Sequence, residues 1–411
     1  MKRVVVTGMS GVSPLGTGWT AVSARLKAMK NTIVRMPEWS KYKGLNTNLA
    51  APVTDFELPP QTYTRKTTRS MGRVALLAVR ASELALEDAG LLGNPAIASG
   101  ITGVAYGSST GSTDAVNDFS RMIQNNSTDG ITATTYIRMM GHTAPVNVGL
   151  FFKAKGRIIT TSSACTSGSQ AIGYSYEAIK TGKQTIMIAG GAEELSPTEA
   201  AVFDTLFATS TKNDAPSTTP SPFDKDRDGL VIGEGAGTLI LEELEHALAR
   251  GARIYAEVTG FATNSDGWHV THPNAESMQV AIQGALDDAG IAPEAIGYIN
   301  AHGTATDNGD VAESHATSKV FGNRVPFSSL KSYMGHTLGA CGALEAWITI
   351  MMMCEGWAAP TLNLNNVDPL CADLDYIRGS VRALSCDTVM SNNFAFGGIN
   401  TSLIFKRWDA S

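Results

Sequence analysis

Three side chains that could take part in one reaction lie in stretches of small residues. Cys165 lies in SSACTSG, His302 opens HGTATDNGD, and His336 lies in KSYMGHTLGACGALEA. A thiolate attacks acyl carbons, and imidazole N–H groups stabilise the charge that develops on a thioester oxygen. One cysteine and two histidines without a paired carboxylate suit thioester chemistry. We therefore expect Cys165 to be the nucleophile and the two histidines to be donors to an enolate oxygen.

The remaining cysteines and histidines lie in no comparable context. A lone cysteine is usually a small buried hydrophobic residue, and a lone histidine is usually a satisfied core or surface residue. The five cysteines are odd in number and form no CxxC pair, so neither a thiolate zinc site nor a complete disulfide framework is predicted. We interpret these residues as structural: Cys341, Cys354, Cys371, Cys386, His142, His246, His269, His272 and His315.

The residues around Cys165 predict a strand end, a tight turn and a helix start. RIITTSSA is strand-like, Ser167 and Gly168 keep the turn small, and a helix begins near Thr166. Functional groups in α/β folds gather at such positions. The unpaired N–H groups and the dipole of a helix start stabilise a thiolate. We therefore expect the helix start to favour the nucleophilic form of Cys165.

An internal repeat predicts the elements that position these residues. Residues 85–91 read ALEDAGL and residues 285–291 read ALDDAGI, each at the end of an amphipathic helix. Each copy is followed by a short apolar strand with a small polar loop. A strand–turn–helix unit comes next, at residues 157–179 in the first copy and 325–350 in the second. An apolar strand that opens into a glycine-rich turn then follows in both copies.

The repeat predicts an α/β fold made of two duplicated βαβαβ halves, residues 1–252 and 253–411. Nearly continuous apolar strands alternate with helices, a pattern typical of sheets covered on both faces. We therefore expect an α/β/α/β/α layered arrangement. Residues 30–68 and 114–155 are less regular and are expected to be insertions that cap the first half.

Composition excludes several classes of protein. The 411 residues are 43% hydrophobic, which indicates a globular chain, and the net charge of −6 disfavours a general nucleic-acid binder. The start, MKRVVVTGMSG, has too short an apolar run for a signal peptide. The longest apolar stretch, residues 346–354, falls short of the ~20 residues that span a bilayer. We expect a cytoplasmic protein without a membrane anchor.

Five motifs carry a family resemblance that runs from Met1 to about Trp408. They are ACTSG, PFDKDRDGLVIGEGAG, HGTATDNGD, KSYMGHTLGACGALE and NNFAFGGIN. The chain resembles the β-ketoacyl-[acyl-carrier-protein] synthases, condensing enzymes with the thiolase-like fold that act in fatty acid and polyketide synthesis. TATDNGD and SNNFAFGGIN are most similar to the ketosynthases of aryl polyene gene clusters.

The resemblance implies an acyltransferase that performs a decarboxylative Claisen condensation. Cys165 would take an acyl chain from acyl carrier protein, and the enolate formed from malonyl carrier protein would attack the Cys165 thioester. His302 and His336 would donate to the malonyl oxygen. Lys331, paired with Glu345, would hold the histidine environment. The backbone N–H groups of Cys165 and Phe396 would form the other oxyanion hole.

Further roles follow from the same resemblance. Thr304 and Thr306 would bind the 4'-phosphopantetheine arm of the carrier, and no other cofactor is expected. Phe396, beside Phe394, would be a gate that moves when the acyl chain enters. No metal is expected, although family members sometimes hold a cation near the position of Glu313.

The resemblance also implies partners. Acyl carrier proteins are acidic, so basic residues are expected to dock them. The chain is expected to form a homodimer, or a heterodimer with a ketosynthase-like paralogue, and to bind neither nucleic acid nor a membrane. Arg73 is interpreted as structural; the residues expected to dock the carrier are Arg65, Lys66, Arg69 and Lys212.

Four positions depart from the usual family pattern. Thr110 and Thr135 replace bulkier apolar residues, which predicts a longer and more polar acyl pocket, and Thr135 could line the pocket of a neighbouring subunit. Ala395 replaces a glycine in the gate loop and is expected to restrict its motion. Asp307 replaces a proline, and the sequence alone does not indicate the effect.

Several alternatives stay open at this point. A non-catalytic chain-length factor would lack the nucleophile, whereas this chain has Cys165. A degradative thiolase uses a second cysteine as acid and base, but here the second half carries His336. A simple acyl-pantetheine-binding module would not require the complete set of three residues. Housekeeping fatty acid elongation is the alternative to an aryl polyene pathway.

Overall fold

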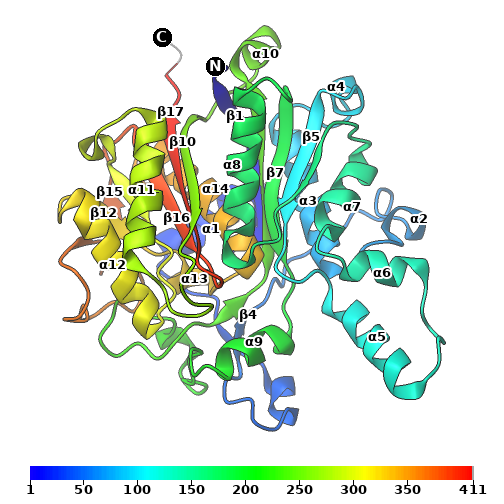
Figure 1. Cartoon of the computed structure of the whole chain (residues 1–411), viewed down its shortest axis with the longest axis horizontal. Helices are drawn as coiled ribbons and strands as arrows, with labels where there is room; N and C mark the ends of the chain where they lie inside the picture. The colour runs from blue at the N-terminus through cyan, green and yellow to red at the C-terminus, as the bar shows by residue number, and fades with distance from the viewer. Residues whose placement is uncertain (410–411) are drawn as a thin grey trace.

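The computed structural model describes residues 1–409 (Figure 1). Its centre is a twelve-stranded sheet in which the first half contributes five main strands in the order β6-β5-β7-β9-β1. Strands β5, β6 and β7 run parallel, and β9 pairs antiparallel with both β7 and β1. The bounds are β1 Val4–Ser13, β5 Thr102–Gly107, β6 Ile158–Thr160, β7 Ile186–Glu193 and β9 Gly235–Glu243.

The second half repeats this topology. Its strands lie in the order β12-β11-β16-β17-β10, which is the order of the first half when each strand is numbered along its own half. Strands β1 and β10 pair antiparallel, with Val5 opposite Glu257, and so join the two halves. The bounds are β10 Ala256–Ser265, β11 Tyr298–Asn300, β12 Pro326–Ser328, β16 Thr388–Phe394 and β17 Ile399–Arg407.

Helices α8 (Ser167–Lys180) and α14 (Cys341–Glu355) lie between the two strand arrays. Their apolar side chains share one buried cluster with strands of both halves, which includes Trp347 and Phe261. Helix α14 is apolar and long enough to cross a membrane when counted from Leu338, but 83% of that segment is buried inside the protein. It is therefore the central core helix of this fold.

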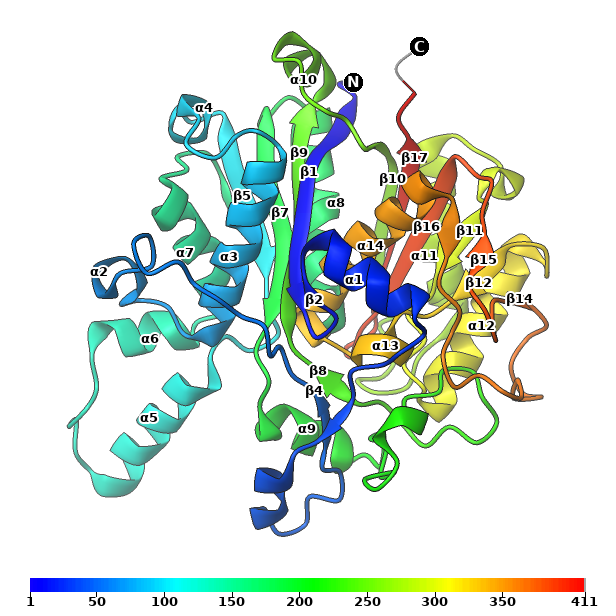
Figure 2. The ribbon, with the colours of Figure 1, turned by 180° about the vertical axis from the view of Figure 1, so that it is seen from behind.

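The outer faces carry the two copies of the repeated helix. Helix α3 (Arg73–Asp88) packs on the first array and contains most of ALEDAGL, and α11 (Ala275–Ala289) packs on the second and contains most of ALDDAGI. Helix α12 (Asp307–Phe321) packs beside α11 (Figure 2). The layers are thus helix, strand array, helix, strand array and helix, and the predicted thiolase-like duplicated fold is confirmed.

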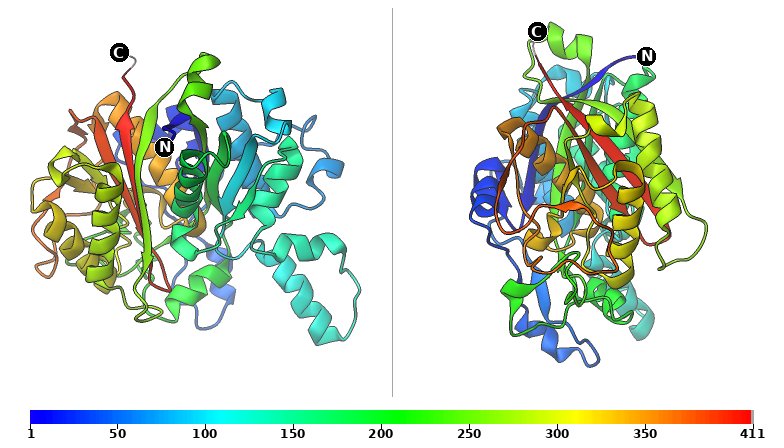
Figure 3. Two further views of the ribbon diagram at one scale, coloured as in Figure 1. Left: turned by 45° about the horizontal axis from the view of Figure 1, so that its top comes forward. Right: turned by 90° about the vertical axis from the view of Figure 1, so that its left-hand side faces the viewer.

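The two irregular segments of the first half lie outside these layers. Helices α5 (Thr113–Asn125) and α6 (Ala133–Met139) form an arm that projects from the body (Figure 3). Helix α7 (Thr143–Phe152) instead packs against β5 and α3. Residues 30–68 contain β3 Val34–Arg35, β4 Leu49–Ala51 and α2 Arg65–Thr68.

The remaining elements connect or cap the layers. A cap strand, β8 (Ile232–Gly233), pairs with β4, and β14 (Asp375–Tyr376) ends the main sheet beside β12. The others are β2 Gly16–Thr17, α1 Gly18–Lys27, α4 Pro95–Ala98, α9 Pro197–Asp204, α10 Leu244–Ala249, α13 Lys331–Met334, β13 Trp357–Ala358 and β15 Arg382–Ala383.

Candidate active site

Cys165 lies in a 3-10 turn, Ala164–Thr166, immediately before helix α8. Ala164 adopts a φ of +51°, a strained value for a residue with a side chain, and this sharp bend carries the chain from the end of β6 into α8. The turn packs against the start of α14. A Cβ on Gly168 would lie 2.7 Å from the backbone nitrogen of Ala343, so only glycine allows this approach. The small residues around Cys165 thus let the two halves meet.

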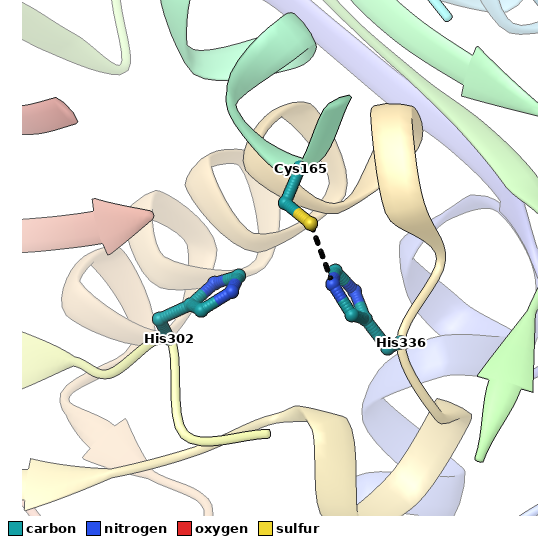
Figure 4. A group of neighbouring side chains, drawn as sticks. All are labelled: Cys165, His302 and His336. Carbon is teal, nitrogen blue, oxygen red and sulfur yellow. Dashed lines mark hydrogen bonds between the residues drawn. The ribbon is translucent and has the colours of Figure 1, made fainter. Parts of the chain in front are cut away.

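The structure brings the three predicted residues together. His302 follows β11, and His336 lies between α13 and the turn that precedes α14. The His336 Nε2 atom lies 2.9 Å from Cys165 Sγ, and the centroids of the two imidazole rings are 5.1 Å apart (Figure 4). All three residues are buried, with at most 7% of their surface exposed. They form one cluster at the junction of the two halves.

Hydrogen bonds fix the tautomers of both histidines. Lys331 Nζ donates to His302 Nδ1 at 3.2 Å, and Asn393 Nδ2 donates to the same atom at 3.4 Å. The backbone N–H of Leu338 donates to His336 Nδ1 at 3.3 Å. Because both Nδ1 atoms accept, the ring proton of each neutral histidine is on Nε2. Both rings therefore direct an N–H group towards the space beside Cys165.

Electrostatics keep both imidazoles neutral. Burial lowers the pKa of His302 well below its usual value, and the Lys331 ammonium and His336 lower it further. Burial and Lys331 also lower the pKa of His336 well below its usual value. Neutral imidazoles act as hydrogen-bond donors to a developing oxyanion without first losing a proton.

The helix start does act on the pKa of Cys165 in the predicted direction, but burial outweighs it in this structure. Burial raises the pKa of Cys165 to about 11, although Lys331 and the backbone N–H groups of Phe396 and Cys165 oppose the rise. Burial destabilises the Cys165 thiolate by more than the nearby hydrogen-bond donors and Lys331 stabilise it. Cys165 is therefore a thiol at neutral pH, and the two N–H groups that lower its pKa are the pair expected to form an oxyanion hole.

Lys331 and Glu345 form a buried ion pair behind the histidines. Lys331 Nζ lies 2.5 Å from Glu345 Oε1, and the two side chains are 1% and 0% exposed. Burial alone would lower the pKa of Lys331, but Glu345, Cys341 and Glu313 together outweigh it and the pKa lies above the usual value. Lys331 contacts His302 rather than the cavity, so the structure places it as a positioning residue.

Asn393 is a positioning residue that the motif analysis did not single out. Its Nδ2 atom contacts His302 Nδ1 and donates to Glu345 Oε2 at 2.8 Å. Cys341, interpreted as structural, also lies here, and its thiol donates to the backbone oxygen of Cys165 at 3.2 Å. Both residues lie inside the quoted motifs, but their spacing alone does not indicate which side chains point towards His302.

A cavity of about 360 Å³ opens over the three residues. Thr304 and Thr306 line it, and their hydroxyl oxygens lie 2.9 Å apart. Asp266 and residues 269–273, between β10 and α11, line another side. The cavity could therefore admit a long, narrow arm whose end reaches Cys165, and both predicted pantetheine-binding residues lie along this route.

The predicted gate also borders the cavity. Phe396 packs against Phe203 of α9 with ring centroids 4.9 Å apart, and Phe394 packs edge-on against His302. The left-handed residues of this loop are Gly397 and Gly398, with φ of +83° and +73°, whereas Ala395 is not left-handed. The substitution at position 395 therefore introduces no strain into this conformation of the loop.

Glu313 supports the turn that carries His302. Its two oxygens accept hydrogen bonds from the backbone N–H groups of His302 and Gly303, both at 2.7 Å. Burial raises the pKa of Glu313 to about 8. A cation near Glu313 stays a prediction. Asp307 is the first residue of α12, a position that favours both proline and acidic residues, which explains how it substitutes for proline.

The predicted docking residues do not form one patch in a single subunit. Arg65, Lys66 and Arg69 are exposed on and beside α2, which lies at the outer edge of the first half, far from α12 at the cavity (Figures 1 and 2). Lys212 lies near the cavity but is 3.5 Å from Asp228, a lining residue. Arg73 forms a bidentate ion pair with Glu234, the structural position expected for it.

The two threonines predicted to line an acyl pocket lie outside this cavity. Thr110 is exposed, and its hydroxyl lies 3.5 Å from Glu199 Oε1. Thr135 is fully buried, and with Thr132 it caps the start of α6. Their roles in chain selection stay predictions.

Comparison with protein families assigns the chain. Residues 1–247 match the family model described as Beta-ketoacyl synthase, N-terminal domain, and residues 255–365 match Beta-ketoacyl synthase, C-terminal domain. The chain therefore belongs to the β-ketoacyl synthase family. The predicted boundary at residue 252 lies between the two matched ranges.

Three relatives show how far the similarity extends. A 3-oxoacyl-[acyl-carrier-protein] synthase 2 from Synechocystis is 39% identical over 99% of this chain and 98% of the relative. A β-ketoacyl synthase from Burkholderia phymatum is 62% identical, with a TM-score of 0.98 over 100% of both chains. The ketosynthase in a type II polyketide synthase complex with its acyl-carrier protein is 30% identical, with a TM-score of 0.87 over 99% of this chain and 100% of that chain.

Proposed function

We propose that this protein is a β-ketoacyl-[acyl-carrier-protein] synthase that condenses malonyl carrier protein with an acyl chain held on Cys165. The observation that carries the proposal is the convergence of one thiol and two Nε2–H groups in one cavity. The family assignment supports the same acyltransferase activity. A non-catalytic chain-length factor is disfavoured because the nucleophile and both donors are present.

In the first half-reaction, Cys165 Sγ attacks the thioester carbonyl of an acyl carrier. The new S–C bond forms as the bond to the pantetheine sulfur breaks, and the thiol proton ends on that departing sulfur, so no external base is consumed. The backbone N–H groups of Cys165 and Phe396 would stabilise the oxyanion between these steps. They already act on Sγ in the resting thiol.

In the second half-reaction, the malonyl thioester loses CO₂ and its remaining electron pair forms an enolate. His302 and His336 would hold the enolate oxygen with their Nε2–H groups. The enolate carbon then attacks the Cys165 acyl carbon, the S–C bond breaks, and the sulfur takes up a proton. The product is a carrier-bound β-ketoacyl chain two carbons longer.

The proposed substrate donor is an acidic acyl carrier protein, and its phosphopantetheine arm supplies the only prosthetic group that the reaction needs. Basic residues of α2 would attract the carrier at long range rather than line the cavity.

We further propose that the chain acts in the cytoplasm, and that it forms a homodimer or pairs with a ketosynthase-like paralogue. The exposed edge strand β6 and the projecting α5–α6 arm support an interface with a second subunit.

The finer proposal is a role in aryl polyene synthesis, supported by the TATDNGD and SNNFAFGGIN motifs. A rigid conjugated chain needs a longer pocket than a flexible short one. We propose that Thr110 and Thr135 line a separate acyl pocket that reaches the neighbouring subunit, so Thr110→Phe or Thr135→Phe should shorten the accepted chains and leave acetyl loading of Cys165 intact. Unchanged chain-length profiles in both variants would contradict the pocket argument and favour housekeeping elongation.

Intact-mass measurement tests the main proposal. Wild-type protein incubated with acyl carrier protein should gain one acyl group, and Cys165→Ala should gain none. Cys165→Gln, whose side chain resembles an occupied thiol, should still release CO₂ from malonyl carrier protein. Cys354→Ala is the matched control, because that thiol lies in another part of the core. Condensation by Cys165→Ala at the wild-type rate would overturn the mechanism.

A further inference from the structure

Two buried carboxyl groups from different elements lie against the loop that follows β5. Glu193, the last residue of β7, is fully buried, and Glu199 of α9 is 5% exposed. The backbone N–H of Ser109 donates to Glu193 Oε2 at 2.7 Å. The hydroxyl of the next residue, Thr110, lies 3.5 Å from Glu199 Oε1. We define Glu193 and Glu199 as the carboxyl pair.

Each member of the carboxyl pair keeps one oxygen atom free. Glu193 Oε2 also accepts from the Ser109 hydroxyl and from the backbone N–H of Gly339, the latter at 3.0 Å. By contrast, Glu193 Oε1 and Glu199 Oε2 are buried and have no hydrogen-bond partner. An unpaired buried polar atom costs about 1–3 kcal/mol of stability. Glu194, the next residue along the chain, is fully paired, since both of its oxygens accept hydrogen bonds. The two free oxygens therefore point to a polar ligand.

The surroundings favour the protonated form of both carboxyl groups. Burial raises the pKa of Glu199 well above its usual value, and Glu193 and Glu194 raise it further. Burial also raises the pKa of Glu193 to about 7. A protonated carboxyl group can donate one hydrogen bond and accept another, which matches a hydroxyl group. A metal cation prefers ionised oxygens, so a neutral polar ligand fits this pair better.

The carboxyl pair lies near the nucleophile, although neither member lines the cavity over it. Glu193 is close enough to Cys165 to raise the pKa of the thiol. Phe203 lies one turn after Glu199 on α9, about 6 Å along the helix axis, and it packs against the predicted gate residue Phe396. An acyl chain on Cys165 that passes the gate would therefore bring its distal end to the carboxyl pair.

We propose that the carboxyl pair binds a hydroxyl group at the distal end of the acyl chain on Cys165, and that Glu199 selects for such chains. This inference rests on the proposed function and on the acyl pocket proposed beside Thr110. The Glu199 carboxyl would donate to the substrate hydroxyl, which would donate in turn to Glu193 Oε1. An apolar chain end would cover both free oxygens and leave them unpaired, so the site should reject it.

Acyl-enzyme formation with paired substrates tests the proposal. One pair is octanoyl-pantetheine and ω-hydroxyoctanoyl-pantetheine, and the other is a phenyl-ended acyl-pantetheine and its phenol-ended counterpart. In at least one pair, wild-type protein should load Cys165 about tenfold faster with the hydroxylated member, as measured by intact mass. The pair with the larger ratio shows whether the hydroxyl is aliphatic or phenolic. Equal rates within both pairs would overturn the proposal.

Substitution of Glu199 then assigns the preference to this side chain. Glu199→Leu should load the apolar member of each pair at least as fast as the hydroxylated one. Glu199→Gln should keep most of the preference, because an amide also donates and accepts hydrogen bonds. Val202→Ala is the matched control, since Val202 lies on the same helix but is 54% exposed, and it should keep the wild-type ratio.

The remaining outcomes separate the two proposals. A hydroxyl preference that persists unchanged in Glu199→Leu would overturn the role of the carboxyl pair. If the leucine variant does not fold, the wild-type ratio and its retention in Glu199→Gln decide the test. Acetyl-pantetheine is too short to reach the pair, so all variants should accept it equally. Failure of wild-type protein to take even the acetyl group would instead refute the proposed function.

Discussion

Removing the ammonium group from Lys331 should separate the structural and catalytic roles of its ion pair. Lys331→Met keeps a long apolar side chain but leaves Glu345 without its cation. Glu345 would retain only amide donors, Asn393 at 2.8 Å and Asn300 at 3.5 Å. Breaking a fully buried pair by removing one partner costs about 3–5 kcal/mol, because the remaining charge is buried without compensation.

The size of this effect can be expressed as a melting temperature. Unfolding entropy near Tm scales with chain length and amounts to roughly 0.9 kcal/mol/K for 411 residues. A loss of about 3–5 kcal/mol should therefore lower Tm by about 3–6 °C. Lys180→Met is the matched control, because its Nζ lies 2.6 Å from Asp288 but the side chains are 19% and 30% exposed. That pair is partly solvated and should contribute about 1 kcal/mol or less.

A double variant then tests the catalytic role. Lys331→Met with Glu345→Gln removes both charges and should recover most of the lost stability. It should not recover decarboxylation of malonyl carrier protein, because His302 Nδ1 still lacks its lysine donor and the Nε2–H tautomer is less strongly favoured. Thermal unfolding and CO₂ release measure the two effects. A change below 1 kcal/mol in the single variant, or full decarboxylation by the double variant, would refute this reasoning.

Three further predictions concern other parts of the site. Alanine at His302 or at His336 should reduce decarboxylation by about 10²- to 10³-fold and acyl transfer less, since each removes one oxyanion donor; a larger loss in transfer would reverse the roles. Burial next to Glu193 raises the pKa of Glu199 well above 4.5, so its ionisation destabilises the fold as pH rises. Glu199→Gln should therefore gain stability over wild type between pH 5 and 8, and a constant difference across this range in urea unfolding would contradict the shift. Charge reversal at Arg65, Lys66 and Arg69, the basic residues on and beside α2, should slow carrier association mainly at low salt. An equal loss of activity with acyl-pantetheine would instead indicate folding damage.

The architecture could be predicted because each copy of the repeat is a short, contiguous stretch of the sequence. The ALEDAGL and ALDDAGI helices and their following strands are recognisable from short apolar patterns, and the duplication predicts that the two halves share one topology. The sequence also indicated Cys165, His302 and His336, because nucleophilic and donor residues in runs of small residues are unusual. These properties depend on residue types and spacing, which a sequence displays directly.

The pKa of Cys165 and the surface position of α2 could not be predicted from residue types and spacing. The pKa of Cys165 depends on how completely the assembled halves exclude water, and this burial outweighs the effect of the helix start. The position of α2 depends on how an irregular insertion folds back, and none of its basic residues lines the cavity.

The duplicated fold also explains why the nucleophile is confined to the first half. Ala164, with φ of +51°, begins the turn before α8, and Leu338, with φ of +48°, begins the corresponding turn before α14. Cys165 follows the first and Gly339 follows the second. A Cβ on Gly339 would lie 2.8 Å from both Glu193 Oε2 and Ser108 Cα, so no cysteine fits there.

The closeness of the two turns therefore requires different residues on each side. One turn presents a thiol, and the other must present a bare backbone so that the first can approach. The second half supplies His336 instead. This residue lies two positions before Leu338, which begins the second turn. The pairing of one nucleophile with hydrogen-bond donors, rather than with a second thiol, follows from how tightly the two halves pack.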